Sequence, residues 1–154
     1  MIPFEFRGKS TYVDDWRIGS LVIVEGKYHI VEDKDLYECG HHIRQETDRP
    51  TWVKKETVGQ YTDLKDKNDR KIYDGDILKS NFSNKPFGIV EWNKDGYFFI
   101  NTDFMHRFDI GSYRPLGEML NMTIKSDGEE KAVYFEVIGN IYDNPDLLPN
   151  EREI

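Results

Sequence analysis

The sequence has few of the residues that build helices. A single alanine, Ala132, stands among 154 residues, and alanine, leucine and methionine together number thirteen. Nine valines, fourteen isoleucines and twenty-one aromatic residues outnumber them. Because β-branched and aromatic side chains favour strands, the composition predicts an all-β, mainly antiparallel protein with one or two short helical turns.

Cysteine and long apolar runs are also scarce. The single Cys39 excludes an internal disulfide and suits a reducing compartment. No apolar stretch approaches the length that crosses a membrane, and residues 1–6 lack the basic start and apolar run of a signal peptide. We therefore expect a cytosolic protein with no membrane partner.

Basic residues are fewer than acidic ones. The formal charge is −8, and from Ser112 onward nine acidic residues face four basic ones. Such a surface repels phosphate backbones, so we expect no binding to duplex DNA. A local basic patch leaves association with nucleic acid open as an alternative, and the acidic end leaves open mimicry of nucleic acid. The patch comprises Lys65, Lys67, Arg70 and Lys71.

Motifs with known chemistry are missing. The sequence has no glycine-rich phosphate loop, nucleophile elbow or His-Glu-x-x-His motif. Cys39 and His41 could approach one metal ion, but no second pair has zinc-site spacing, and His41 and His42 would point to opposite faces of a strand. We therefore expect no metal site and no cofactor.

The acidic residues around Gly75 and Asn68 have structural interpretations. Asp74 and Asp76 share one face of an extended segment and could serve acid–base chemistry, but such residues more often cap a bend, here around Gly75. The stretch from Asp66 resembles the start of a calcium loop, yet Ile77 stands where that loop requires Glu. No catalytic residue is predicted, and an enzyme of unrecognised type remains the minority alternative.

Alternation and turn residues divide the chain into three parts. An N-terminal β subdomain spans 1–54, a barrel-like β subdomain spans 55–142 with a helical insertion near 112–122, and a turn and tail span 143–154. In the first part, Leu21–Val24 and Tyr28–Val31 flank Glu25-Gly26-Lys27, a hairpin signal. Both strands are apolar on both faces, which indicates either burial between two layers or contact with another molecule.

The central part contains two turns that require unusual backbone geometry. Asn68-Asp69 sits at a polar hairpin tip where one residue is expected to adopt positive φ. Gly75 is expected to form a bend between strands. Further on, Asp95-Gly96 joins two strands that include Trp92 and Tyr97–Ile100. This order is similar to a small SH3-like barrel, which we predict for the second subdomain.

Three separated motifs resemble the YopX-like proteins of phages and prophages. The opening motif is Phe6-Arg7-Gly8-Lys9 with Trp16 and Gly19-Ser20-Leu21; the central motif combines Glu56–Thr62, Asp66-Lys67-Asn68, Lys71-Ile72-Tyr73 and Gly75-Asp76-Ile77; the closing motif is Val137–Pro145. The sequence departs from the pattern at Asp69, where glycine is usual, and at Asp74, where glutamate is frequent. The resemblance implies a phage-derived cytoplasmic protein and carries over no catalytic residue.

These observations favour a non-enzymatic protein-binding or adaptor module. Its partner would be a host or phage protein, or a second copy of the chain in a homo-oligomer. Aromatic strands of small barrels commonly form interfaces, and the strand Tyr97–Ile100 has more apolar surface than a thin barrel can cover. The candidate interaction surface predicted from the sequence comprises Tyr73, Asp74, Asp76, Trp92, Tyr97 and Phe99.

Overall fold

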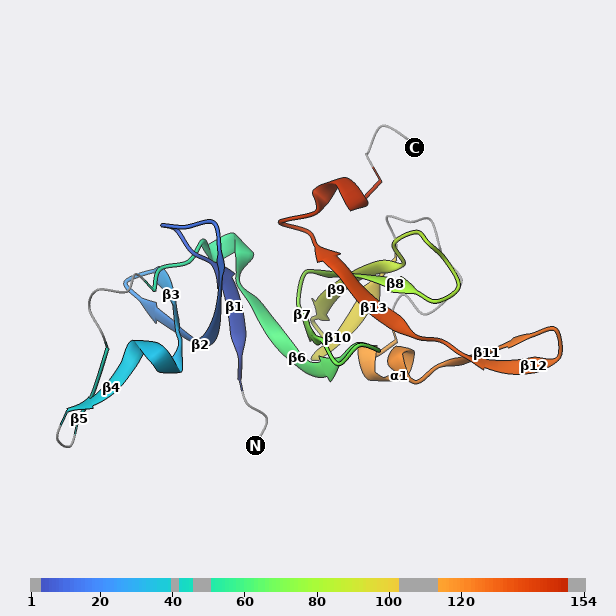
Figure 1. Ribbon diagram of the computed structural model, residues 1–154, viewed down its shortest axis with the longest axis horizontal. Helices are drawn as coiled ribbons and strands as arrows, with labels where there is room; N and C mark the ends of the chain where they lie inside the picture. Colours follow the sequence, from blue (N-terminus) through green and yellow to red (C-terminus); the bar gives the residue numbers. More distant parts are fainter. Residues whose placement is uncertain (1–3, 40–41, 46–50, 103–113, 150–154) are drawn as a thin grey trace. The chain divides into compact units, whose positions relative to one another are not determined.

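The structure is a computed structural model that describes residues 4–39, 42–45, 51–102 and 114–149. Short antiparallel strands dominate it (Figure 1), which confirms the predicted all-β class. The chain divides into two compact units, Met1–Tyr61 and Thr62–Ile154. Within the described ranges, no helix has the length and apolar character needed to span a bilayer.

The first unit is a small sheet with a second hairpin. Its elements are β1 (Phe6–Lys9), β2 (Trp16–Val24), β3 (Lys27–Val31), η1 (Asp33–Asp35), β4 (Leu36–Cys39), β5 (His42–Gln45), η2 (Lys55–Thr57) and the first residues of β6 (Gly59–Lys65). Hydrogen bonds order the main sheet as β3-β2-β1-β6-β7, with β6 passing from the first unit into the second.

Residues 51–54 lie between two strands of the first unit. The Val53 amide donates to the Tyr28 carbonyl of β3 over 3.0 Å, and the Lys54 amide donates to the Lys9 carbonyl of β1 over 2.8 Å. This segment therefore satisfies backbone groups of β1 and β3, the two strands on either side of β2.

Buried polar groups complete the small core of the first unit. Ile30 and Val53 are buried there beside Arg7, whose guanidinium carbon lies 4.8 Å from the centre of the Trp16 ring. Asp35 has no exposed surface and accepts hydrogen bonds from the Arg17 guanidinium and, over 2.9 Å, from the Glu32 amide. Such pairing is what a buried charge requires.

The second unit has its own sheet and core. Its elements are the rest of β6, β7 (Lys71–Tyr73), β8 (Asp76–Ser80), β9 (Gly88–Asn93), β10 (Tyr97–Asn101), α1 (Leu116–Leu120), β11 (Thr123–Ser126), β12 (Glu129–Ala132), β13 (Phe135–Asn140) and η4 (Pro145–Leu147). A four-stranded sheet has the order β10-β9-β8-β13, while β11 and β12 form a hairpin that projects from the unit in Figure 1.

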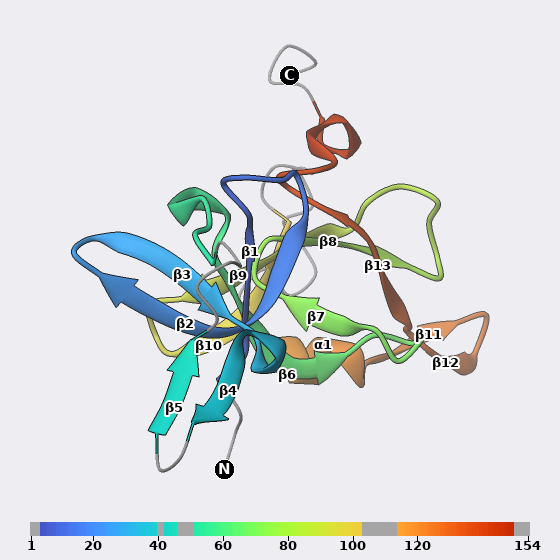
Figure 2. The ribbon, with the colours of Figure 1, turned by 60° about the vertical axis from the view of Figure 1, so that its left-hand side comes forward.

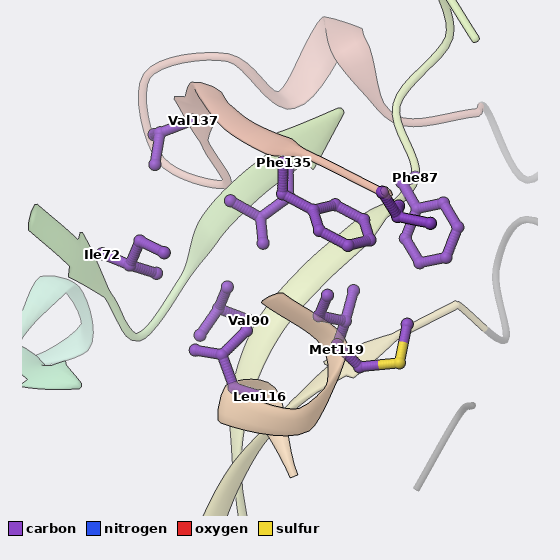
Figure 3. Close-up of a cluster of buried hydrophobic side chains, with 10 residues drawn as sticks. Ile72, Phe87, Val90, Leu116, Met119, Phe135 and Val137 are labelled. Carbon is purple, nitrogen blue, oxygen red and sulfur yellow. The ribbon is translucent and has the colours of Figure 1, made fainter. Parts of the chain in front are cut away.

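Helix α1 covers one face of the four-stranded sheet. Leu116 and Met119, three residues apart, lie on one side of the helix and point toward Val90 (Figure 3), and Ile100 belongs to the same buried cluster. Phe135 belongs to the same buried cluster. The alternation of β13 places Phe135 and Val137 on the core side, as expected for a strand with one buried face.

Several predicted elements need correction. The alternation of apolar and charged residues over residues 4–7 predicts a first strand that ends at Gly8. Instead, β1 spans Phe6–Lys9 and includes Gly8, where an added Cβ would lie 2.9 Å from a Val53 methyl carbon. Glycine is needed there for close packing rather than for a turn. The apolar residues of 132–138 predict one long strand, but this stretch is divided between two elements, since β12 ends at Ala132 and β13 begins at Phe135.

The four-stranded sheet is open, so the SH3-like barrel predicted for the second subdomain is not confirmed. The short helix expected near 112–122 is present as α1, with Pro115 at its N-cap position. The pair Asn144-Pro145 predicts a helical turn with Asn144 as its N-cap. Asn144 does occupy the N-cap position of η4, but its side chain accepts a hydrogen bond from the Asn140 amide over 3.2 Å instead of capping the turn.

Candidate functional site

The Asp66 carboxylate organises the hairpin tip of the central motif. Asp66 is 8% exposed. Its Oδ1 accepts hydrogen bonds from the amides of Asn68 (2.8 Å) and Arg70 (3.0 Å), and its Oδ2 accepts one from the Val137 amide of β13 (2.9 Å). One carboxylate thus shapes the turn and attaches it to a strand that lies 71 residues further along the chain.

The residue that departs from the family pattern in this turn has the geometry that glycine prefers. Asp69 has φ of 63°, in the left-handed region, as predicted. Its side chain is exposed and pairs with Lys65 at 2.9 Å. An exposed pair of this kind contributes little to stability.

We predict that Asp69→Gly is neutral or stabilises the fold by about 0.5 kcal/mol, because glycine relieves the strain of positive φ while loosening the unfolded chain. Denaturant unfolding measures the effect. Asn68→Gly is the control, since Asn68 has no positive φ to relieve and glycine there should only destabilise. A loss above about 1 kcal/mol for Asp69→Gly would contradict the prediction.

The central and closing motifs meet at Gly75. Gly75 has φ of 86°, which confirms the predicted bend, and its carbonyl accepts a hydrogen bond from the Ile141 amide over 3.0 Å. Asp76, which is fully buried, accepts one from the Tyr73 amide over 2.8 Å and pairs in register with Asn140 of β13. The Asp76 carboxylate thus closes the bend around Gly75.

We predict that Gly75→Ala destabilises the protein by about 1 kcal/mol or more, because alanine is strained at positive φ and its Cβ would lie 3.2 Å from the Tyr142 ring. Thermal or denaturant melts measure the loss. Gly96→Ala is the matched control, since Gly96 also has positive φ but open space around it. A Gly75→Ala variant that melts like the wild type would contradict the interpretation that the bend requires glycine.

Asn140 builds the closing motif in the same manner. Its Oδ1 accepts hydrogen bonds from the amides of Tyr142 (3.0 Å) and Asp143 (2.9 Å), and its Nδ2 donates to the Asp143 carboxylate over 3.1 Å. The family signature in the second unit is therefore a set of side chains that hold turns and join β13 to the β6–β8 region. Each of these hydrogen bonds has a structural role in a turn or between strands.

The structure places the six residues of the predicted interaction surface in different environments. Tyr73, Asp76 and Phe99 are buried, Asp74 and Tyr97 are half-buried, and Trp92 is exposed. Trp92 is 52% exposed and packs against Phe98, its partner across the β9–β10 pair, at 4.8 Å between ring centres. Of the six, Trp92 offers the most surface to another molecule.

Acidic neighbours pair with two of the four residues of the basic patch. Lys65 pairs with Asp69, and Lys67 Nζ lies 2.9 Å from Glu136 Oε2. Lys79 of β8 contacts the other oxygen of Glu136 at 2.6 Å. The hydrogen bonds from Lys79 and then Lys67 lower the pKa of Glu136 to about 2.

We predict that these pairs stabilise the fold at neutral pH and less so in acid. The folded pKa of Glu136 is lowered from 4.5, so its contribution is present above about pH 4.5 and is lost as the pH falls toward about 2. The difference in denaturation midpoint between the wild type and Glu136→Gln should therefore shrink over this range. A difference that does not change with pH would show that the contacts are unimportant in solution.

The metal interpretation of Cys39 and His41 cannot be followed in the structure, because His41 lies outside the described residues. Elsewhere in the described ranges, no group of three or more His, Cys, Asp or Glu side chains is placed to hold a metal ion. The buried carboxylates of Asp35, Asp66 and Asp76 each accept at least one backbone amide.

A groove of about 250 Å³ lies in the second unit beside the Asp66 turn. Leu64, Leu120 and the exposed Tyr134 give it apolar walls, and Lys65 and Lys67 lie at it. Sequence reasoning missed this groove because its walls come from β6, α1 and the start of β13, which only folding brings together.

The most exposed apolar surface lies in the first unit. Eight of the eleven exposed large hydrophobic side chains among the described residues belong to it. Four of them lie on one strand, β2, at 41–54% exposure, and we call them the β2 surface: Ile18, Val22, Ile23 and Val24. The two-layer burial that the pattern allowed for this hairpin is not found in the described residues.

Beside this hairpin lies a group of aromatic and basic side chains. Lys27 Nζ stands 4.4 Å from the centre of the Trp52 ring, and His29 meets the same ring edge-on at 5.7 Å. Burial and then the charge of Lys27 lower the pKa of His29, which keeps the imidazole neutral at neutral pH. His29 Nδ1 and Thr51 Oγ1 lie 2.9 Å apart.

The fold defines an antiparallel β protein of two units, and a solved structure shares it. The crystal structure of protein EF1440 from Enterococcus faecalis is 22% identical, covers 97% of this chain and 100% of its own, and has a TM-score of 0.51. This likeness concerns the fold alone.

The family follows from the sequence match. The family model described as "YopX protein" matches residues 5–149, and the chain belongs to the YopX family. No curated protein matches the chain. The family assignment confirms the resemblance carried by the three motifs.

Proposed function

We propose that this chain is a non-enzymatic protein-binding or adaptor module that contacts its partner through the β2 surface. The observation that carries the proposal is the exposure of Val22, Ile23 and Val24 at 41–54% on both faces of one hairpin. Exposed apolar groups gathered on one element are a common mark of protein interfaces. The hairpin extends past the end of β1 (Figure 2), so a partner can reach both faces.

The use of polar residues elsewhere supports a binding role. The side chains of the signature residues Asp66, Asp76 and Asn140 accept hydrogen bonds from backbone amides, so these polar residues of the motifs maintain the fold. Two lysines of the basic patch are paired with carboxylates, which favours a protein partner over nucleic acid. As part of the proposal, the module acts in the bacterial cytoplasm and does not bind duplex DNA.

Site-specific photocrosslinking tests the proposal. A benzophenone amino acid replaces Ile23 in one variant and Phe82 in the control, two side chains of similar exposure in different units. Both variants are illuminated in bacterial cells, and adducts are identified by mass spectrometry. We expect a protein adduct from position 23 and none from position 82. The absence of any protein adduct at position 23 would overturn the proposed function.

Fluorescence anisotropy with labelled duplex DNA tests the second part of the proposal, that the protein does not bind duplex DNA. We expect no binding at physiological ionic strength. Tight binding that weakens steeply with salt would instead support a nucleic-acid function, since released counterions give that dependence.

A further inference from the structure

The outer half of β2 has a neighbour on one side. Strand β1 pairs with β2 from Trp16 to Gly19, while β3 pairs with β2 from Ser20 to Val24. Past Gly19, no strand among the described residues takes the place of β1. Residues 20–24 therefore present an open strand edge in the described part of the chain (Figure 2).

The turn of the hairpin determines which backbone groups face this edge. Glu25 and Gly26 both have positive φ, 50° and 76°, as in a two-residue type I′ turn. In such a hairpin the pair that closes the loop, Val24 and Lys27, exchanges both hydrogen bonds. By alternation, the amide and carbonyl groups of Leu21 and Ile23 point away from β3, toward the open edge.

This edge lacks the features that keep edge strands apart. The run Ile18–Val24 contains no charged residue, no proline and no bulge in its pairing with β3. Charges, proline and bulges are the usual means by which proteins prevent strand addition. An extended, uncharged, apolar strand would fit the edge, and the same run in a second copy of the chain is such a strand.

We propose that two copies of the chain pair through the open edges of β2, antiparallel about a two-fold axis at Val22. This inference rests on the proposed function and names its partner. Leu21 of one copy then exchanges hydrogen bonds with Ile23 of the other, and Val22 meets its own counterpart. This register pairs Leu21 with Ile23, the two residues whose backbone groups point toward the open edge, and places the axis at the middle of residues 20–24.

Charge distinguishes a second copy from another partner. Each copy carries a formal charge of −8, so two copies repel one another at long range, while the paired segments themselves are uncharged. Screening by salt therefore strengthens self-pairing. A basic partner attracted by the acidic surface would show the opposite dependence.

Sedimentation equilibrium over a concentration series tests the pairing. We expect a monomer–dimer equilibrium whose dissociation constant falls when ionic strength rises from about 0.1 M to about 1 M. A strict monomer under all conditions would overturn the inference. A dimer that dissociates as salt rises would overturn it too, since that behaviour indicates an interface held by opposite charges.

Charged variants at the two-fold axis test the register. Val22→Lys places two lysines opposite each other and should weaken the dimer about tenfold or more. Val22→Glu should do the same. An equimolar mixture of the two variants should recover the dimer, because lysine then faces glutamate. Val13→Lys is the matched control, since Val13 is also an exposed valine but lies outside β2.

Each outcome has one meaning. If neither variant affects a wild-type dimer, or if mixing fails to recover it while circular dichroism shows folded proteins, the two-fold pairing at Val22 is wrong. If a variant unfolds, Val22→Cys in a Cys39→Ser background replaces it, because a disulfide should form readily across an axis where the Cα atoms lie about 4.5 Å apart. A failure to form that disulfide, with Val13→Cys as control, overturns the register.

The photocrosslinking experiment separates this inference from the proposed function. A monomer in sedimentation together with an adduct from position 23 to a different protein would overturn self-pairing and leave the binding role intact. A monomer without any adduct would overturn both.

Discussion

Asp66→Ala is expected to lower the free energy of unfolding by about 3 kcal/mol. The substitution removes the acceptor of three amides, those of Asn68, Arg70 and Val137. The hydrogen bond from the Val137 amide of edge strand β13 to Asp66 is buried, so the variant leaves that amide without an acceptor, and a buried donor without an acceptor is costly. The turn would also lose its attachment to β13. Chemical denaturation of the second unit measures the effect.

Two further variants separate the carboxylate's role from other effects. Asp66→Asn should have an intermediate effect, because the amide keeps one oxygen acceptor and places its NH₂ group against a backbone donor. Asp95→Ala is the control at an exposed aspartate of another turn, where a change within about 0.5 kcal/mol is expected. If Asp66→Ala unfolds no more easily than Asp95→Ala, the three amides do not depend on this side chain in solution.

Local turn chemistry could be predicted from the sequence because the residues that decide it are adjacent. Glu25-Gly26 and Asn68-Asp69 were both expected at hairpin tips, and both contain residues with positive φ. Gly75 was expected at a bend and has φ of 86°. In each case the relevant physics is the steric freedom of a few neighbouring residues.

The projecting hairpin was missed for the opposite reason. Strands β11 and β12 contain four charged residues out of eight, and most of their side chains are exposed or half-buried. Without a buried face, they lack the apolar alternation by which a strand is recognised. The Asp127-Gly128 pair itself predicts the turn between them, but the residues on either side of it do not predict the two strands.

The function of Asp66 depends in part on a contact distant in sequence. The acceptor role of Asp66 toward Val137 arises only when β13 lies beside the turn. The six-residue interaction surface was chosen from aromatic content and alternation, which do not report which face the core covers. Phe99, for example, shares a strand face with Tyr97 by alternation, yet Phe99 is buried while Tyr97 is half-buried.

The hairpin illustrates a choice that the pattern could not make. Apolar residues on both faces of Leu21–Val24 were compatible with burial between layers or with a partner. The end of the β1 pairing at Gly19 decides the matter within the described residues, because it leaves Val22, Ile23 and Val24 exposed. Whether this hairpin is covered depends on the length and register of the neighbouring strands, which the whole sheet determines and the local pattern does not show.

Phe135→Ala is expected to have the largest effect, a loss of about 4 kcal/mol in the free energy of unfolding. The side chain is 1% exposed in the core cluster of the second unit and meets Phe87 edge-to-face, with 5.0 Å between ring centres (Figure 3). Alanine would leave a cavity between β13 and α1, and the well-packed surroundings can close it only in part.

The neighbouring residue provides the matched control for this variant. Tyr134 precedes Phe135 in the chain and is 54% exposed, so alternation turns it toward solvent. Tyr134→Ala should therefore change stability by about 1 kcal/mol or less. Denaturant melts of the two variants, followed by circular dichroism, give the comparison. Equal losses would mean that the second unit has no packed core at Phe135, whereas the expected contrast places that core on the inner face of β13.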